Sequence, residues 1–164
     1  MLKKTILTFI SLFLLNINNS FAAPINDLER GDTIVGVTSG SKNSMYYLET
    51  QNTDNLIIGI QSLDLRSDGI ATDYYVQVKM DDISRVIVGN RIHHSRSKSY
   101  LGGAIQNELA PDIEGYASLI AGDGLQELQL GANYKLTDIS DININFSTTS
   151  GSQSSVGIGL SCKF

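Results

Sequence analysis

Val156-Gly157-Ile158-Gly159-Leu160-Ser161-Cys162-Lys163-Phe164 are the last nine residues of the chain, and apolar residues alternate strictly with small or polar ones along them. A period of two is typical of a strand with one buried and one exposed face. In an open sheet such a terminal strand would be an unprotected edge, whereas a closed barrel has no edge. Membrane barrels place the apolar face outward and an aromatic residue at the interface. The stretch therefore predicts the closing strand of a transmembrane antiparallel up-and-down β-barrel.

In this terminal pattern the chain resembles bacterial outer-membrane β-barrels, whose final strand ends in Phe and is read by the barrel-assembly machinery. The resemblance implies a porin-like protein of the Gram-negative outer membrane, with lipid and lipopolysaccharide as its surroundings. It also implies that the assembly signal consists of Val156, Ile158, Leu160 and Phe164.

The N-terminus has the pattern of a cleaved secretory signal. Lys3 and Lys4 precede an apolar run from Thr5 to Leu15, and Ser20-Phe21-Ala22 places small residues where signal peptidase requires them. The run is too short to span a bilayer as a helix. We therefore expect a signal peptide over residues 1–22 and one outer-membrane barrel over residues 23–164, with a retained anchor as the alternative.

Charge and cysteine content restrict the partners. Residues 1–22 carry two lysines and no acid, so their removal changes the net charge from −5 to −7, which argues against nucleic acid as a partner. A single cysteine, Cys162, excludes an internal disulfide. We expect no cofactor and no metal.

Four short segments share a pattern typical of tight turns, in which a small polar residue or Pro precedes Asp. Their aspartates are separated by 28, 30 and 26 residues and are Asp54, Asp82, Asp112 and Asp138. Asp favours turns because its side chain bonds the local backbone. Two membrane-crossing strands of about ten residues and two tight turns require roughly 28 residues. The spacing predicts ten strands, with these four turns on the periplasmic side.

The predicted strands are 32–39, 44–52, 56–64, 72–80, 84–92, 99–109, 113–121, 125–136, 140–148 and 154–164. Alternation is weak in the first, second and seventh of these, and 113–121 could instead be a loop. Eight strands are therefore the alternative.

Polar residues on the opposite face of these strands predict a polar lumen. The expected inward set includes Gln77, Lys79, Arg85, Arg91, Gln106, Glu108, Glu114, Glu127, Gln129, Lys135, Asp141, Asn143 and Asn145. A barrel of this size is nearly filled by its own side chains, so we expect a self-satisfied network, with a narrow passive pore as the alternative. The aromatic residues cluster near strand ends, as two interfacial belts require. The other fold considered is a soluble periplasmic β-sandwich or barrel, whose large residues would point inward.

The densest basic cluster lies in the predicted third outer loop. We expect contacts to lipopolysaccharide phosphates, which pair well with Arg and Lys, from Arg91, His93, His94, Arg96 and Lys98. Adjacent histidines on an extended chain point to opposite faces, which disfavours a metal site. His93-His94-Ser95 with Glu108 loosely resembles the His, Ser and acid sets of lipid A deacylases, but Arg96 stands where those enzymes keep Asn. A lipid A-modifying hydrolase is therefore the less favoured alternative, and no catalytic residue is assigned.

Three stretches, Glu108–Asp112, Leu130–Asp138 and Val156–Phe164, resemble the YfaZ-type small outer-membrane proteins. This resemblance covers about the last third of the chain. It implies a barrel of unassigned function, with a structural or surface-interaction role, and brings no catalytic residues.

Overall fold

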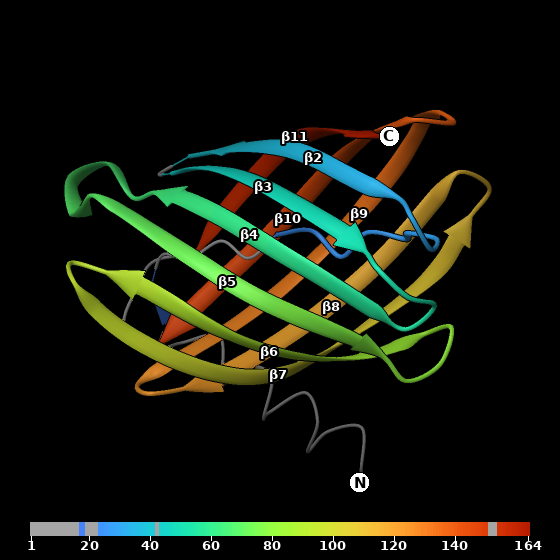
Figure 1. Ribbon diagram of the computed structural model, residues 1–164. Coiled ribbons are helices and arrows are strands. Elements are labelled where there is room, and N and C mark those ends of the chain that lie inside the picture. The colour runs from blue at the N-terminus through green and yellow to red at the C-terminus, as the bar shows by residue number, and fades with distance from the viewer. Residues whose placement is uncertain (1–16, 19–22, 42, 151–153) are drawn as a thin grey trace, which may run out of the picture.

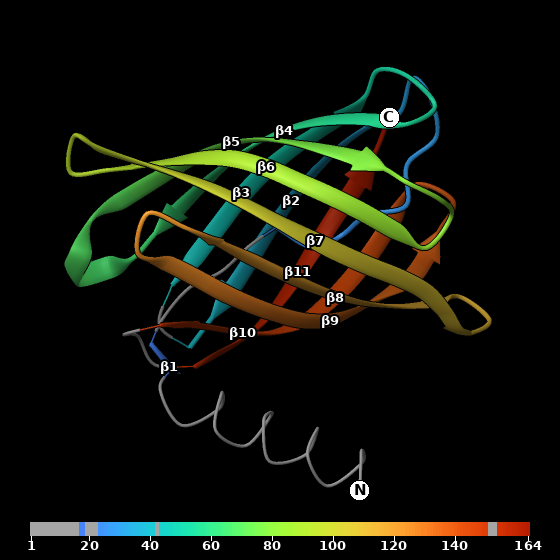
Figure 2. The ribbon, with the colours of Figure 1, turned by 90° about the horizontal axis from the view of Figure 1, so that it is seen from below.

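A closed barrel of ten antiparallel strands is seen in the computed structural model, which describes residues 17–18, 23–41, 43–150 and 154–164. Each strand pairs with its sequence neighbours, and β11 pairs with β2 to close the barrel. The ten tilted strands surround the blue segment that precedes β2 (Figures 1 and 2). They are β2 (Thr33–Gly40), β3 (Ser44–Gln51), β4 (Leu56–Asp64), β5 (Ile70–Lys79), β6 (Ser84–His93), β7 (Arg96–Ala110), β8 (Ile113–Gly122), β9 (Leu125–Thr137), β10 (Ser140–Ser150) and β11 (Ser155–Lys163).

Two small elements accompany the barrel. The two-residue β1 (Ile17–Asn18) pairs with the end of β10, and the 3-10 turn η1 (Arg66–Asp68) connects β4 to β5. Residues 1–22, the predicted signal peptide, lie outside the described residues except for β1. Among the described residues, no helix is long and apolar enough to cross a membrane.

The ten predicted strands are confirmed, and every observed end lies within three residues of its predicted position. The eight-strand alternative is wrong, because β8 pairs along its length with both β7 and β9. The alternation of apolar and polar residues is weak in β8 because this strand places large side chains in the lumen and small ones on the outer face. Tyr116 and Ile120 are buried in the lumen, whereas Gly115 and Ala117 lie on the outer face.

All four predicted Asp turns lie at one end of the barrel, which we call the Asp-turn end; the opposite end is the loop end. In three turns, however, the residue before the predicted Asp makes the stabilising contacts. The Asp81 carboxylate accepts hydrogen bonds from the backbone N–H groups of Ile83 (2.8 Å) and Ser84 (2.6 Å). The hydroxyls of Thr53 and Thr137 accept backbone N–H groups in the same way. Side-chain acceptors of this kind fix tight turns.

The outer surface of the barrel is apolar. On β11, Val156, Ile158 and Leu160 are 58%, 59% and 53% exposed, and comparable residues cover the other strands. A soluble barrel would place such residues inside, so the soluble alternative is wrong. The fold is that of a transmembrane antiparallel barrel, with an apolar outside and a polar inside.

Four tyrosines point into the lumen and cover glycines on the adjacent strand. Tyr47 is paired with Gly36, and a Cβ added to that glycine would lie 2.2 Å from the ring. The other three pairs are Tyr75 over Gly59, Tyr100 over Gly89 and Tyr116 over Gly131. Aromatic rings over glycines stabilise curved barrel strands. The expectation that the aromatic residues near strand ends form two interfacial belts is therefore wrong for these four tyrosines, whereas Tyr46, Tyr74, Tyr134 and Phe164 do lie exposed on the outside.

Candidate functional site: the barrel lumen

A buried ion-pair network crosses the lumen. The Arg91 guanidinium on β6 donates to both carboxylate oxygens of Asp73 on β5, each at 2.7 Å, and to Glu127 on β9 at 3.1 Å. The side chains of the two acids are 0% and 1% exposed. Such bidentate pairs are strong and directional. Gln61 also donates to Asp73, at 2.8 Å, so that the network is anchored on three neighbouring strands and reaches a fourth.

A second buried acid lies closer to the Asp-turn end. Glu49 on β3 is 0% exposed and accepts hydrogen bonds from the Tyr75 hydroxyl and the Gln77 amide, both at 2.8 Å. Arg85 lies beside it and donates to Gln77 at 3.3 Å. We call the inward faces of β3 to β7, which carry these groups, the charged wall.

The segment before β2 lies inside the barrel (Figure 1). We call residues 23–28 the N-terminal segment; its Ile25 and Leu28 are only 2% and 1% exposed. They belong to the same buried apolar cluster as Met45 and Ile57 of the charged wall. Sequence reasoning missed this segment. The signal that could have found it is the presence of large apolar residues on the inward face of strands 44–51 and 56–64, which require an apolar partner in the lumen.

Polar contacts hold the N-terminal segment against the wall. Its Ala23 N–H donates to Gln61 Oε1 at 2.6 Å, and its Asn26 amide donates to Glu49 at 2.7 Å. In return, its backbone carbonyls accept hydrogen bonds from Asn133 at 2.8 Å, Arg85 at 2.8 Å and Lys79 at 2.5 Å. One backbone N–H and three backbone carbonyls of the segment are thereby paired with side chains of the barrel.

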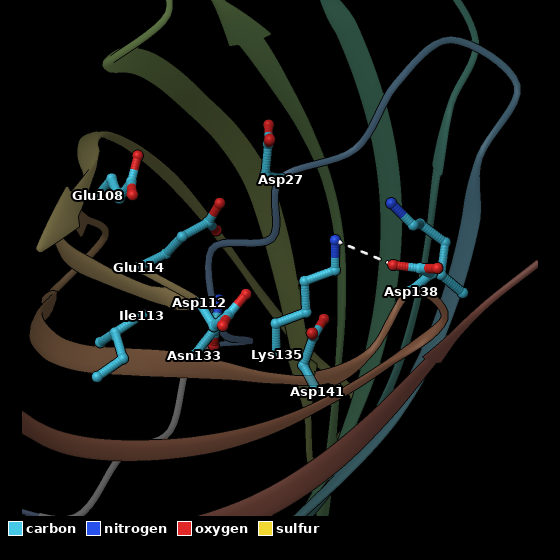
Figure 3. A pocket seen from close by; sticks show the side chains of 10 residues that line it. Asp27, Glu108, Asp112, Ile113, Glu114, Asn133, Lys135, Asp138 and Asp141 are labelled. Carbon is cyan, nitrogen blue, oxygen red and sulfur yellow. Dashed lines mark ion pairs between the residues drawn. The ribbon is translucent and has the colours of Figure 1, made fainter. Parts of the chain in front are cut away.

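An acidic cavity of about 220 Å³ opens at the Asp-turn end. We call it the acidic vestibule; six carboxylates and two lysines line it, as Figure 3 shows for most of them. The carboxylates belong to Asp27, Glu108, Asp112, Glu114, Asp138 and Asp141. Lys135 lies 3.5 Å from Asp138, and Lys163 pairs with Asp32, so the cavity keeps an excess of negative charge. Among the described residues, no group of three or more His, Cys, Asp or Glu has the arrangement of a metal site.

The opposite side of the lumen carries small neutral residues. We call the inward faces of β10, β11 and β2 beyond the acidic vestibule, to which Asp141 and Lys163 belong, the neutral wall; it presents Asn143, Asn145, Ser161, Gly159 and Thr38. Asn143 Nδ2 and Asn145 Oδ1 are buried and have no hydrogen-bond partner among the described residues. Buried polar groups normally bind protein or water. The neutral wall is therefore where ordered water fits best.

The predicted lipopolysaccharide-contact residues do not lie together. Arg91 is buried in the lumen, so its assignment as a surface contact is wrong. Strand β6 continues to His93, and Arg91 lies on the same inward face of that strand as Arg85 and Ile87. His94 and Ser95, both with positive φ, form the two-residue turn between β6 and β7. His93 contacts the Asp68 carbonyl at 2.8 Å and stacks on His94.

Arg96 and Lys98 lie exposed on a projecting hairpin. Residues 96–100 of β7 pair with β6 alone, since pairing with β8 begins only at Leu101. His94, Arg96 and Lys98 are exposed there. Of the five predicted contact residues, these three are the ones that lie exposed outside the lumen.

The geometry separates the residues that suggested a hydrolase. Ser95 lies at the loop end, whereas Glu108 lies in the acidic vestibule at the other end of β7. At about 3.3 Å per residue, the thirteen steps between them correspond to roughly 40 Å. An acid must contact the catalytic base directly, so these residues cannot form one catalytic set.

The predicted assembly signal lies on the outer face of the closing strand. Val156, Ile158 and Leu160 point outward, and Phe164 is 78% exposed at the Asp-turn end. The Phe164 backbone N–H donates to the Thr33 carbonyl at 2.8 Å, so the terminus completes the seam with β2.

Comparisons with solved structures agree with the fold. The KdgM porin, including its complex with disordered oligogalacturonate, is similar over 81% of this chain and 99% of that one, with 11% identity and a TM-score of 0.51. A de novo designed transmembrane β-barrel matches over 85% of this chain and 100% of its own, with 19% identity and a TM-score of 0.44. A mutant porin of Rh. blastica matches over 74% of this chain and 44% of its own, with 13% identity and a TM-score of 0.43.

No protein-family model matches the chain, and a search of curated proteins also finds no match. Identities this low bear on the fold alone. The chain therefore shares the architecture of the porin-type outer-membrane barrels.

Proposed function

We propose that the protein is an integral barrel of the bacterial outer membrane with a sealed lumen, serving a structural or surface-interaction role. The apolar outer face suits lipid, and the predicted signal peptide would direct the chain across the inner membrane. The Asp-turn end then faces the periplasm and the loop end faces outward.

The observation that carries this proposal is the filling of the lumen. The Arg91 network crosses it, and the N-terminal segment occupies the space below. Between them, the cavity lined by Ala23, Gln61, Tyr100 and their neighbours measures about 20 Å³. Such a volume accommodates about one water molecule and no solute. A permanently open pore is therefore disfavoured.

The exposed hairpin tip is the proposed contact with lipopolysaccharide. His94, Arg96 and Lys98 project beyond the rim of β8, where phosphate groups of outer-leaflet headgroups would lie. Each exposed contact is expected to contribute no more than about 1 kcal/mol and to weaken with salt. We further propose that the barrel-assembly machinery recognises the outer face and the end of the closing strand, through Val156, Ile158, Leu160 and Phe164. We also propose that the chain belongs with the YfaZ-type proteins.

Location and closure can be tested together. The protein should fractionate with outer membranes, shift its gel mobility on boiling, and conduct negligibly in planar bilayers. Phe164→Asp should impair assembly and leave export intact. Recovery from the soluble periplasm without a mobility shift would contradict the location, and steady large conductance would contradict the sealed lumen.

The hairpin contact needs its own test. Arg96→Ser with Lys98→Ser should lower co-purifying lipopolysaccharide, and the reduction should shrink as salt rises, while the folded gel mobility stays unchanged. Arg30→Ser, an exposed change at the Asp-turn end, is the matched control. Unchanged lipid content in the double variant would refute this contact.

A further inference from the structure

We propose that the N-terminal segment is a displaceable plug, and that its removal opens a path for small cations from the acidic vestibule along the neutral wall, beside the Arg91 network, to the loop end. This inference rests on the proposed sealed barrel and adds a conditional transport activity. Three features support it: the side-chain hydrogen bonds that hold the segment, the two cavities that the segment touches, and the negative charge of the acidic vestibule.

The segment belongs to the lumen without being part of the barrel wall. It makes no strand pairing of its own; five hydrogen bonds from wall side chains, or to them, hold Ala23, Ile25, Asn26 and Leu28. The barrel itself closes independently, through backbone pairing between β11 and β2. Withdrawal of the segment would therefore break side-chain contacts and leave the ladder of the barrel intact.

Withdrawal would also join spaces that the segment now separates. An extended chain occupies a cross-section about 5 Å across, comparable to the spacing of paired strands. The acidic vestibule meets the segment at Asp27, and the small cavity meets it at Ala23 and Ile25. The neutral wall continues from the vestibule along β10 and β11, where Asn143 and Asn145 offer buried, unpartnered polar atoms to water.

The entrance favours cations. Asp27 leaves with the segment, and the five carboxylates of the barrel then face two lysines in the acidic vestibule, both of which already lie beside carboxylates. A second observation is independent of this charge: Asn133 is 6% exposed, lines the vestibule, and its Oδ1 has no hydrogen-bond partner among the described residues. A carbonyl oxygen of this kind can coordinate water or a hydrated cation. Clefts lined by one sign of charge concentrate ions of the opposite sign.

The test compares bilayer conductance of the intact mature protein with that of a variant lacking residues 25–28. The intact protein should stay closed, and the folded deletion variant should show discrete, cation-selective openings. Adding a peptide of residues 23–28 should block them. Arg30→Ser, which changes an exposed residue just after the segment, should remain closed.

A second variant covers the case in which the deletion does not fold. Ile25→Ser with Leu28→Ser keeps the chain length and removes the apolar contacts, so it should open more often than the intact protein. A folded, plug-deficient barrel that does not conduct would overturn the inference while leaving the sealed-barrel function standing. An intact protein that conducts as well as the deletion variant would overturn both.

Selectivity tests the vestibule separately. Glu114→Gln with Asp141→Asn in the deletion background should reduce the cation preference measured from reversal potentials in a salt gradient. Single-channel conductance should persist. Anion preference in the deletion variant before these changes would contradict the proposed role of the vestibule.

Discussion

The charged wall and the neutral wall enclose the same lumen but differ in how their polar groups are satisfied. On β3 to β7, the carboxylates of Glu49 and Asp73 each accept several hydrogen bonds from neighbouring side chains. On β10, buried amide atoms of Asn143 and Asn145 lack partners among the described residues. The saturation of the charged wall concerns its carboxylates, since Tyr47 Oη and Gln51 Oε1 on β3 also lack a hydrogen-bond partner among the described residues. A saturated network of charged groups is rigid and sensitive to loss of any member, whereas an unsaturated surface accommodates water. The two walls should therefore respond differently to equivalent changes.

The largest loss of stability is expected from a substitution at Arg91, in the charged wall. Arg91→Ala leaves Asp73 and Glu127 as buried acids without their cation, and should lower the free energy of unfolding by about 3–5 kcal/mol. The exposed Arg96→Ala should change it by no more than about 0.5 kcal/mol. Urea titrations in detergent, followed by the mobility of the folded band, measure both. Equal effects would contradict the network.

Matched amide substitutions compare the walls directly. Gln61→Leu removes the donor to Asp73 and the acceptor of the Ala23 N–H, and should cost about 1.5–3 kcal/mol. Asn145→Leu removes a long hydrogen bond to Asn143, at 3.2 Å, and a polar neighbour of the Tyr116 hydroxyl, and should cost no more than about 1 kcal/mol. The same titrations measure the pair. A larger loss at Asn145 would reverse the comparison.

Glycine substitution examines how closely the neutral wall is packed. A Cβ at Gly159 would lie 2.4 Å from the Val37 carbonyl oxygen, so Gly159→Ala should cost about 1–3 kcal/mol through overpacking. At Gly103 the nearest atom is 3.5 Å away, and alanine should be tolerated. Thermal loss of the folded band would compare the two variants, and equal stability would count against close packing.

The smallest effect is expected outside both walls, in the β5–β6 turn. Hydrogen bonds from the Ser84 hydroxyl and from the backbone N–H groups of Ile83 and Ser84 lower the pKa of Asp81 below its ordinary value of 3.8. The ionised carboxylate therefore stabilises the turn above that ordinary pKa, and this contribution disappears as the pH falls through the lowered value. Asp81→Asn should lack this pH dependence. Urea midpoints between pH 7 and pH 3 check it, and identical profiles for both proteins would contradict the assignment.

The strands could be predicted because lipid imposes a period of two on the outer face. Val156, Ile158 and Leu160 identify the outer face of β11, whichever residues face the lumen between them. The Asp-turn spacing then supplied the strand count, since hairpins joined by tight turns have nearly constant length.

The lumen could be predicted only in part, because its contacts join residues that are distant in sequence. Gln77, Glu127 and Asn145 were expected inside and are buried there. Arg91 was expected both on the inward face and among the lipopolysaccharide contacts. Its burial confirms the first expectation and contradicts the second, because the hairpin turns only at His94. The N-terminal segment escaped notice because no local pattern indicates that Ile25 packs in the same cluster as Met45.

The most direct measurement is a high-resolution experimental structure of the mature protein with ordered water resolved. The expected result is the N-terminal segment against Glu49 and Gln61, with Arg91 dry between Asp73 and Glu127. Water molecules should occupy the sites beside Asn143 Nδ2 and Asn145 Oδ1. A segment lying outside the barrel, or water between Arg91 and Asp73 with the neutral wall dry, would contradict the sealed and asymmetric lumen.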